Sequence, residues 1–220
     1  MIFWPYYLKQ KLREAKERWK EKIENEYVWV TDLVHCPHRY ELSLQYPEIA
    51  IGQFSSTQYV LGELLHQAIE SQPIFQSFEK EREIEKEYGK FKIRGRPDLW
   101  DPKNKILIEI KTGRDVKSPP SPHHVLQVWI YKQILGSQQE FIIYATYGRI
   151  VEVELTQIDY QDIFTQLKAQ QMSMINMPDI LGKYVAWWWG AAPTPLWPWE
   201  CDYCPYAHLC ALRKTQNKKR

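Results

Sequence analysis

The chain has 220 residues, of which 44% are hydrophobic and 25% are charged, and its formal net charge is +2 at pH 7. This length suffices for one hydrophobic core with a smaller appended segment. No apolar run approaches the ~18 residues needed to cross a bilayer, and no apolar segment after the N-terminus resembles a signal peptide. The small net charge disfavours a protein that binds nucleic acid by overall attraction alone. We therefore expect a cytoplasmic globular protein, without a membrane partner, that uses local sites.

The first 50 residues are predicted to be helical. Residues 9–26 alternate basic and acidic side chains, which is typical of an exposed helix whose charge pairs mostly aid solubility. We assign that helix a structural or partner-binding role. Thr31 is a candidate N-cap for the helix that carries Cys36. Residues 1–50 are thus expected to form an N-terminal helical segment.

A second helix is predicted over residues 59–71. Apolar side chains recur there at helical spacing, at Val60, Leu61, Leu64, Leu65, Ala68 and Ile69. His66 lies within that apolar face, and a histidine in such a position is more often a core residue than a metal ligand. Gly62, one turn earlier, permits close approach of a neighbouring backbone.

Strands are predicted near residues 80–88, 91–100 and 105–112. The turn-forming residues 101–105 lie between the last two, so those two strands are expected to form an antiparallel hairpin. Pairing about that turn sets Asp98 nearly opposite Glu109.

Glu109 and Lys111 are two residues apart on a strand, so both point to the same face while Ile110 points into the core. On an exposed strand this would be an ordinary solvated charge pattern. The apolar residues 106–108 instead indicate a buried strand, where charges are costly unless they are paired or bound to metal. Together with Asp98, these residues suit a divalent cation and a water molecule that attacks a phosphodiester.

The remaining elements complete an α/β sandwich around one mixed sheet. Gln127 and Tyr131 share one face of a predicted helix over residues 122–135, where they are surface residues or else hold a phosphate or position Lys111. The other predicted elements are a loop at the site's rim over 116–124, strands over 141–146 and 150–155, and a helix over 160–172.

In chain order, four short motifs resemble the RecB-like branch of the PD-(D/E)xK nuclease superfamily. They are Gly62-x3-His66, Gly95-Arg96-Pro97-Asp98, Glu109-Ile110-Lys111 and Gln127-x3-Tyr131. The resemblance implies a restriction-endonuclease-like core with a mixed central sheet flanked by helices. It also implies one or two Mg²⁺ or Mn²⁺ ions held by His66, Asp98, Glu109 and the carbonyl group of Ile110. Lys111 matches the catalytic lysine of that family.

The four cysteines indicate a second metal site. Cys36 stands alone, and Cys201-x2-Cys204-x5-Cys210 lies near the other end. Intracellular proteins rarely keep disulfides, so zinc or an iron–sulfur cluster is the better explanation than unliganded thiols.

One cysteine before the nuclease motifs and three after them resemble the iron–sulfur RecB-like nucleases. Among these, the short, free-standing members are the CRISPR-associated exonucleases, the fourth Cas family, and the resemblance covers about residues 31–212. It implies that the four thiolates hold a [4Fe-4S] cluster in a helical clasp joining the two ends of the chain. A [2Fe-2S] centre also takes four cysteines, so the cluster type stays open.

The predicted nuclease core spans residues 51–184, and residues 185–220 form a cluster-binding segment with a basic tail. Tryptophans at 187–189, 197 and 199 precede the cysteines. Such rings stack on unpaired bases or enclose a cluster, and we favour enclosure. Basic residues of the tail, from 213 to 220, are either frayed or in contact with phosphates.

The expected activity is that of a metal-dependent exonuclease acting on single-stranded DNA. The resemblance implies trimming of DNA fragments before their integration as CRISPR spacers, with CRISPR integrase proteins as partners. A repair or recombination nuclease would use the same residues beside a helicase, which must be a separate protein because no phosphate-binding Gly-x4-Gly-Lys-Ser/Thr loop occurs here. A non-catalytic, cluster-stabilised DNA-binding adaptor is the alternative from another class.

Overall fold

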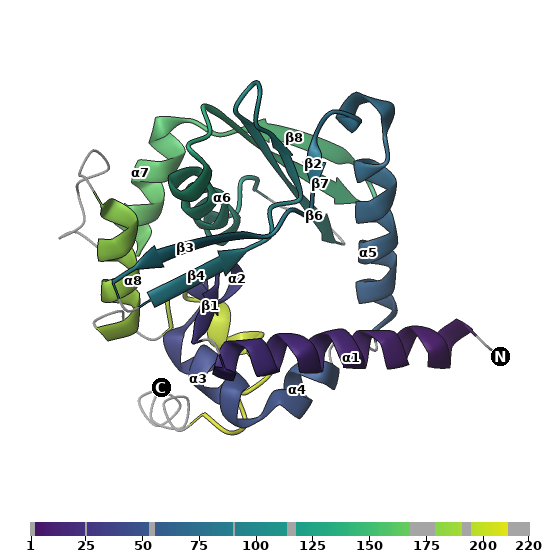
Figure 1. Cartoon of the computed structure of the whole chain (residues 1–220), viewed down its shortest axis with the longest axis vertical. Helices are drawn as coiled ribbons and strands as arrows, with labels where there is room; N and C mark the ends of the chain where they lie inside the picture. The colour runs from purple at the N-terminus through teal and green to yellow at the C-terminus, as the bar shows by residue number, and fades with distance from the viewer. Residues whose placement is uncertain are drawn as a thin grey trace.

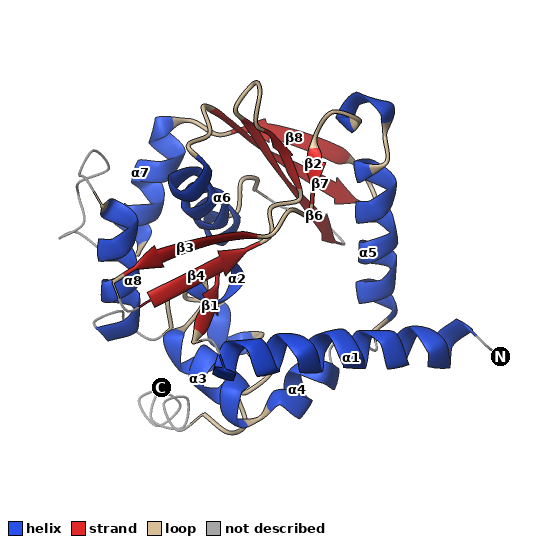
Figure 2. Cartoon of the chain, in the orientation of Figure 1, coloured by secondary structure: helices blue, strands red, loops and turns tan. Residues whose placement is uncertain are grey.

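The computed structural model describes residues 3–24, 26–52, 56–89, 91–113, 118–167, 179–190 and 195–210. Helices surround two mixed β-sheets, which Figure 2 shows as two separate groups of strands. The predicted α/β class is confirmed, but the prediction of one sheet is wrong. The basic tail lies outside the described residues.

A five-stranded sheet carries the predicted hairpin. Its strands are, in spatial order, β2 (Glu79–Lys80), β5 (Leu99–Asp101), β6 (Ile106–Gly113), β7 (Gln139–Thr146) and β8 (Ile150–Glu154). Strands β6 and β7 are parallel, whereas the other neighbours are antiparallel. The hairpin and the two later strands are therefore confirmed.

The smaller sheet has the order β1 (Tyr27–Trp29), β4 (Phe91–Gly95) and β3 (Ile84–Tyr88). The prediction of one strand over 91–100 is wrong, because the chain leaves this sheet after Gly95 and enters the larger sheet at Leu99 (Figure 1). Pro97 lies in the crossing and has no N–H group for strand pairing.

Strand β1 corrects the prediction of an all-helical N-terminal segment, since Tyr-Val-Trp favours a strand and pairs in parallel with β4. Thr31 is not the predicted N-cap. It lies inside a short helix, whereas Cys36 itself precedes the first residue of the following helix.

The helices are α1 (Phe3–Glu24), α2 (Val30–Leu33), α3 (Pro37–Gln45), α4 (Pro47–Gly52), α5 (Thr57–Glu70), α6 (Pro122–Leu135), α7 (Gln157–Gln166) and α8 (Ile180–Gly190), with short 3-10 turns at η2 (Pro73–Phe75) and η4 (Glu200–Asp202). The predicted range of α6 is confirmed. Residues 122–124 of the expected loop over 116–124 therefore belong to this helix. Residues 116 and 117 of that loop lie outside the described residues. Helix α7 begins before the predicted position 160, and 168–172 is outside the described residues. Helix α8 was not predicted.

Helix α6 lies at the centre of the main core. All residues from 125 to 131 on this helix are buried, and a helix buried on all sides loses the amphipathic pattern of a surface helix. Trp129, 1% exposed, packs edge-on against Phe164 of α7 and Tyr184 of α8. This burial fixes Gln127 and Tyr131 in place as buried polar residues.

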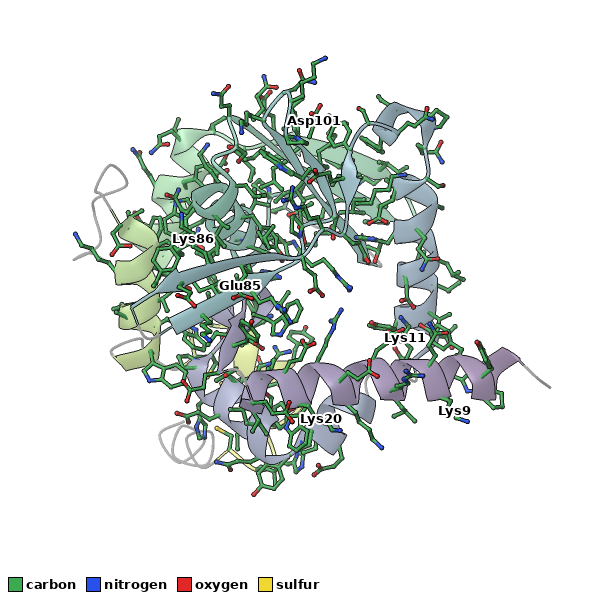
Figure 3. All side chains as sticks on the ribbon, in the orientation of Figure 1. Lys9, Lys11, Lys20, Glu85, Lys86 and Asp101 are labelled. Atoms are coloured by element: carbon green, nitrogen blue, oxygen red, sulfur yellow. The ribbon has the colours of Figure 1, made fainter. Side chains whose placement is uncertain are left out.

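Helix α1 joins distant parts of the fold. Lys11 forms an ion pair with Glu63 where α1 passes α5 (Figures 1 and 3). Toward its other end, Lys22 Nζ lies 2.7 Å from Asp32 Oδ2 of α2. These contacts agree with the structural role expected of this helix, although its charges do more than aid solubility.

In the ranges described above, no helix combines the length and apolar character required to cross a membrane.

Candidate active site

The β5–β6 hairpin brings the two predicted acidic ligands together. Leu99 pairs with Ile108, so the preceding Asp98 lies beside Glu109. Asp98 Oδ2 accepts a hydrogen bond of 2.6 Å from the backbone N–H of Ile110. Asp101 closes the hairpin turn, because its carboxylate accepts hydrogen bonds from the backbone N–H groups of Lys103 and Asn104.

Glu109 is the most buried acidic residue of the site, with 2% of its surface exposed. Its Oε1 accepts hydrogen bonds from Lys111 Nζ at 2.8 Å and from Gln127 Nε2 at 2.7 Å. Its Oε2 is buried and has no hydrogen-bond partner among the described residues. A buried carboxylate oxygen without a partner is costly, so this atom suits a bound cation.

The charges of the site depend on one another. Burial raises the pKa of Glu109, and the nearby Asp98 carboxylate raises it further, against the effect of Lys111. Burial alone would lower the pKa of Lys111, but the negative charges of Glu109 and Asp98 raise it above its ordinary value. Lys111 is therefore a cation at neutral pH.

His66 reaches this site from α5. Its Nε2 lies 3.0 Å from Asp98 Oδ2, and its Nδ1 lies 2.9 Å from Glu70 Oε1. Burial alone would lower the pKa of His66, but its contacts with these two carboxylates raise it to about 10. The histidine thus lies between two acidic side chains.

The predicted apolar core face of α5 is wrong. Leu61 and Leu64 are 47% and 53% exposed, and Val60 is the buried apolar residue of this helix. The close approach expected at Gly62 is confirmed, because a Cβ atom there would lie 2.8 Å from Thr112 Oγ1 of β6. Helix α5 thus approaches β6 closely at Gly62, and its Ile69 packs against apolar residues of the larger sheet.

Gln127 and Tyr131 both face the site from α6. Gln127 Oε1 accepts a hydrogen bond of 2.7 Å from Lys111 Nζ, so its amide group links Lys111 to Glu109. The hydroxyl group of Tyr131 accepts a hydrogen bond of 3.3 Å from the backbone N–H of Arg96. Gln127 therefore contacts Lys111 and Glu109, whereas Tyr131 supports the chain crossing that carries Asp98.

A groove of about 800 Å³ borders the site. It lies between α1, α5 and the end of β6, and is lined among others by Lys11, Arg18, His66, Arg96, Thr112 and Tyr147. His66 is thus the site residue that faces the groove, with Asp98 and Glu109 buried behind it.

Comparison with known proteins agrees with this geometry. Residues 71–211 match the PD-(D/E)XK nuclease superfamily. Over 96% of its length the chain is 32% identical to the CRISPR-associated exonuclease Cas4 of Saccharolobus solfataricus, and it covers 98% of that protein. The chain belongs to the PD-(D/E)XK superfamily, in the family of this exonuclease. The crystal structure of SSO0001 resembles this nuclease with a TM-score of 0.76 at 30% identity, and the match covers 97% of this chain and 98% of that one.

A second candidate site of the nuclease surrounds Cys36. The backbone carbonyl groups of residues 33, 34 and 35 accept hydrogen bonds from Tyr184 Oη, Trp197 Nε1 and Trp188 Nε1, at 2.6, 2.8 and 2.7 Å. The backbone N–H of Cys36 donates to Glu200 Oε1 at 2.6 Å. Four consecutive residues, the 33–36 segment, are thus bound by side chains from more than 140 positions away.

These contacts hold the segment of Cys36 against Trp197 and Glu200, which precede the other three cysteines in the sequence. Glu200, which binds the amide group of Cys36, directly precedes Cys201. Burial raises the pKa of Cys204, opposed by the positive charge of Arg39 on α3, and the Cys210 thiol is also close enough to affect it. All four cysteines are free of disulfide bonds. Four cysteine thiols are the donor type that an iron–sulfur cluster takes, and their binding of a cluster here stays a prediction.

The contacts of the tryptophans agree with packing more than with base stacking. Trp188 and Trp197 are 1% and 2% exposed and bind the 33–36 segment, whereas Trp189 is 47% exposed.

Sequence reasoning missed three residues near the two sites. Glu70 follows His66 by four positions on a helix, which is a spacing that could have been noticed. Glu200 gives no comparable signal, because its partner Cys36 is remote in sequence. His123, whose ring centre lies 4.8 Å from that of Trp199, was taken as part of a loop.

Proposed function

We propose that this nuclease is a metal-dependent exonuclease of single-stranded DNA that carries an iron–sulfur cluster. The observation that carries the proposal is the convergence of Asp98, Glu109 and Lys111 with His66 at the edge of the groove. Nucleases of this superfamily generally use divalent cations.

The residues of the site fit such a cation. His66 Nε2, Asp98, Glu109 Oε2 and the Ile110 carbonyl group are the donors that would hold Mg²⁺ or Mn²⁺, and Oε2 has no other described partner. When bound, the ion would lower the pKa of a coordinated water molecule and offset negative charge on the scissile phosphate.

Lys111 is the residue that we assign to the reacting phosphate. Its ammonium group has three N–H donors, and two of them bind Glu109 and Gln127. Its side chain is 20% exposed, so we assign the third donor to the substrate. Because Glu109 and Gln127 already hold its ammonium group as a hydrogen-bond donor, we infer that it stabilises the charge of the transition state rather than acting as the base.

Gln127 holds Lys111 in position for this role. Its amide oxygen accepts from the ammonium group, while its amide nitrogen donates to the same Glu109 oxygen that Lys111 binds. The three side chains thus form a closed ring of hydrogen bonds. Such a ring fixes the ammonium group before the substrate arrives, which reduces the reorganisation needed in the transition state.

The dimensions and lining of the groove support an unpaired strand as substrate. Its volume, about 800 Å³, is within the ~300–1,000 Å³ typical of small-ligand pockets, which is enough for a few nucleotides. Arg18 and Arg96 supply positive charge, and Tyr147, 65% exposed, offers a ring for a base.

For the cluster, we propose that Cys36, Cys201, Cys204 and Cys210 bind [4Fe-4S], with [2Fe-2S] as the alternative. We expect a structural role, because the cluster would join two segments that already contact each other through Glu200. The similarity to a CRISPR-associated exonuclease supports a place in CRISPR spacer acquisition, trimming DNA ends for the integrase proteins.

The test is digestion of single-stranded DNA labelled at either end, with Mg²⁺, Mn²⁺ or EDTA. We expect cleavage with Mg²⁺ or Mn²⁺ and none with EDTA, with products that shorten progressively from an end. Cleavage that continues in EDTA would disprove metal dependence, and products from the middle of the strand would disprove exonuclease action.

Lys111→Ala tests the site itself. The substitution is expected to abolish cleavage while the protein stays folded and binds DNA. Lys86→Ala is a matched control, because Lys86 is an exposed lysine on β3 outside the groove (Figure 3). Cleavage by the Lys111 variant at the rate of the control would remove Lys111 from the mechanism.

A further inference from the structure

We propose that Glu70 positions His66, holding its imidazole ring so that Nε2 is the nitrogen presented to the divalent cation. This inference rests on the proposed metal-dependent function, and it adds a residue that none of the four nuclease motifs contains.

The two residues are arranged for this role on one face of α5. They are four positions apart, so their side chains are neighbours on the helix. The 2.9 Å contact between His66 Nδ1 and Glu70 Oε1 lies on the opposite side of the ring from the 3.0 Å contact between Nε2 and Asp98. In metal sites, the nitrogen that binds the ion is set by what the other ring nitrogen donates to, most often a carboxylate or a carbonyl group.

The burial of Glu70 supports the assignment. It is 8% exposed, although the apolar Leu61 and Leu64 of the same helix are about half exposed. Its Oε1 has no aligned hydrogen bond among the described residues, so it is able to accept one from the Nδ1–H group once Nε2 binds the ion. A buried carboxylate is costly without such a partner, and helix packing alone would favour an apolar side chain here.

A separate cation site is the competing explanation. His66, Glu70 and Glu81 offer ligand atoms within 4.8 Å of one another. Glu81, however, is exposed and lies 3.8 Å from Arg96, which already compensates its charge. In contrast, Asp98 Oδ2 lies 3.0 Å from Nε2, and Asp98 itself lies beside the buried Glu109 on the hairpin. The geometry therefore favours one cation bound through Nε2.

The experiment measures Mn²⁺ binding to the full chain by electron paramagnetic resonance, in parallel with cleavage. We compare the unaltered chain with Glu70→Gln, and with Glu81→Gln as a matched removal of one charge from the same group. The Glu70→Gln variant is expected to bind one Mn²⁺ per chain with an affinity about 10- to 100-fold weaker, as loss of a ligand-orienting partner does in other metal sites. The midpoint of thermal unfolding should not change, and saturating Mn²⁺ should restore most of kcat. Glu81→Gln should bind Mn²⁺ with an affinity close to that of the unaltered chain.

Three results would overturn the proposal. The first is Glu70→Gln with unchanged Mn²⁺ affinity. The second is a stoichiometry of two Mn²⁺ per chain, with one lost in both glutamine variants, which would make Glu70 a ligand of a separate site. The third result applies if Glu70→Gln does not fold, in which case Glu70→Asp replaces it. That variant keeps the negative charge on a shorter side chain. An Mn²⁺ affinity equal to that of the unaltered chain would then show that the contact between Glu70 and His66 is not needed. An unaltered chain that binds no Mn²⁺ would overturn the proposed function as well, whereas one that binds Mn²⁺ without cleaving DNA would overturn the proposed function alone.

Discussion

Glu200 should be essential for holding the C-terminal segment against the 33–36 segment, even without a cluster. The residue is 2% exposed. Its Oε1 accepts a hydrogen bond of 2.6 Å from the backbone N–H of Cys36, and its Oε2 accepts one of 3.1 Å from the backbone N–H of Leu196. His35 Nδ1 lies 3.2 Å from Oε1.

Glu200→Ala removes both acceptors at once. Leaving one buried donor without a partner costs about 1–3 kcal/mol, so the two orphaned N–H groups should lower the free energy of unfolding by about 2–6 kcal/mol. That is a large fraction of the ~5–15 kcal/mol that stabilises a typical domain. Glu200→Gln keeps one acceptor oxygen and places an amide nitrogen opposite the second N–H group, so it should lose roughly half as much.

The assay is urea unfolding of iron-free, reduced protein, which separates these contacts from any contribution of a cluster. Asp202→Asn is the matched control, because Asp202 is an exposed acid two residues away and its replacement should change stability by less than about 0.5 kcal/mol. If Glu200→Ala unfolds at the same urea concentration as that control, the two hydrogen bonds do not stabilise the fold and the reasoning is wrong.

Two further predictions concern stability. Gly95→Ala should lower the free energy of unfolding by about 1–3 kcal/mol, because its Cβ atom would lie 2.6 Å from the buried Tyr131 ring. Thermal unfolding is the measurement, and Gly148→Ala is the control, because a Cβ atom there meets nothing within 4 Å and should leave stability unchanged. Burial lowers the pKa of His123 to about 4, so the unfolded chain binds a proton below the ordinary value near 6.5 that the folded chain does not. Stability should therefore fall as the pH decreases from about 6.5 to 4, and His123→Gln should reduce that dependence in unfolding curves measured across this range; an unchanged dependence would show that His123 is already protonated in the folded protein.

The hairpin and α6 were predictable because their signals are local. Turn residues at 101–105 and alternating charged and apolar residues at 109–111 fix the pairing that puts Asp98 beside Glu109. Helix α6 begins at Pro122, at a position that favours helix starts, and its residues from 125 to 131 are apolar except for Gln127. These two elements carry most of the candidate active site.

Other features depend on contacts between remote residues. Nothing near Tyr27–Trp29 shows that this strand pairs in parallel with β4, and nothing near Ile180–Gly190 shows that a helix rich in tryptophan packs on α6. The exposed apolar residues of α5 were misassigned for the same reason, because the periodic pattern does not say which side of the helix meets the sheet. The partners of Glu200 were equally invisible in the sequence.

The crossing between the two sheets makes the geometry of the proposed metal site depend on how the sheets are held together. Asp98 is the last residue of this connection, and its carbonyl group accepts a hydrogen bond from the backbone N–H of Glu81. Two residues earlier, the hydroxyl group of Tyr131 accepts a hydrogen bond from the backbone N–H of Arg96. Glu109, in contrast, is in the middle of the larger sheet. A tilt of the smaller sheet relative to the larger one would therefore pull on Asp98 against its hydrogen bond to Ile110, so the rigidity of this joint sets how accurately the nuclease can preorganise its centre.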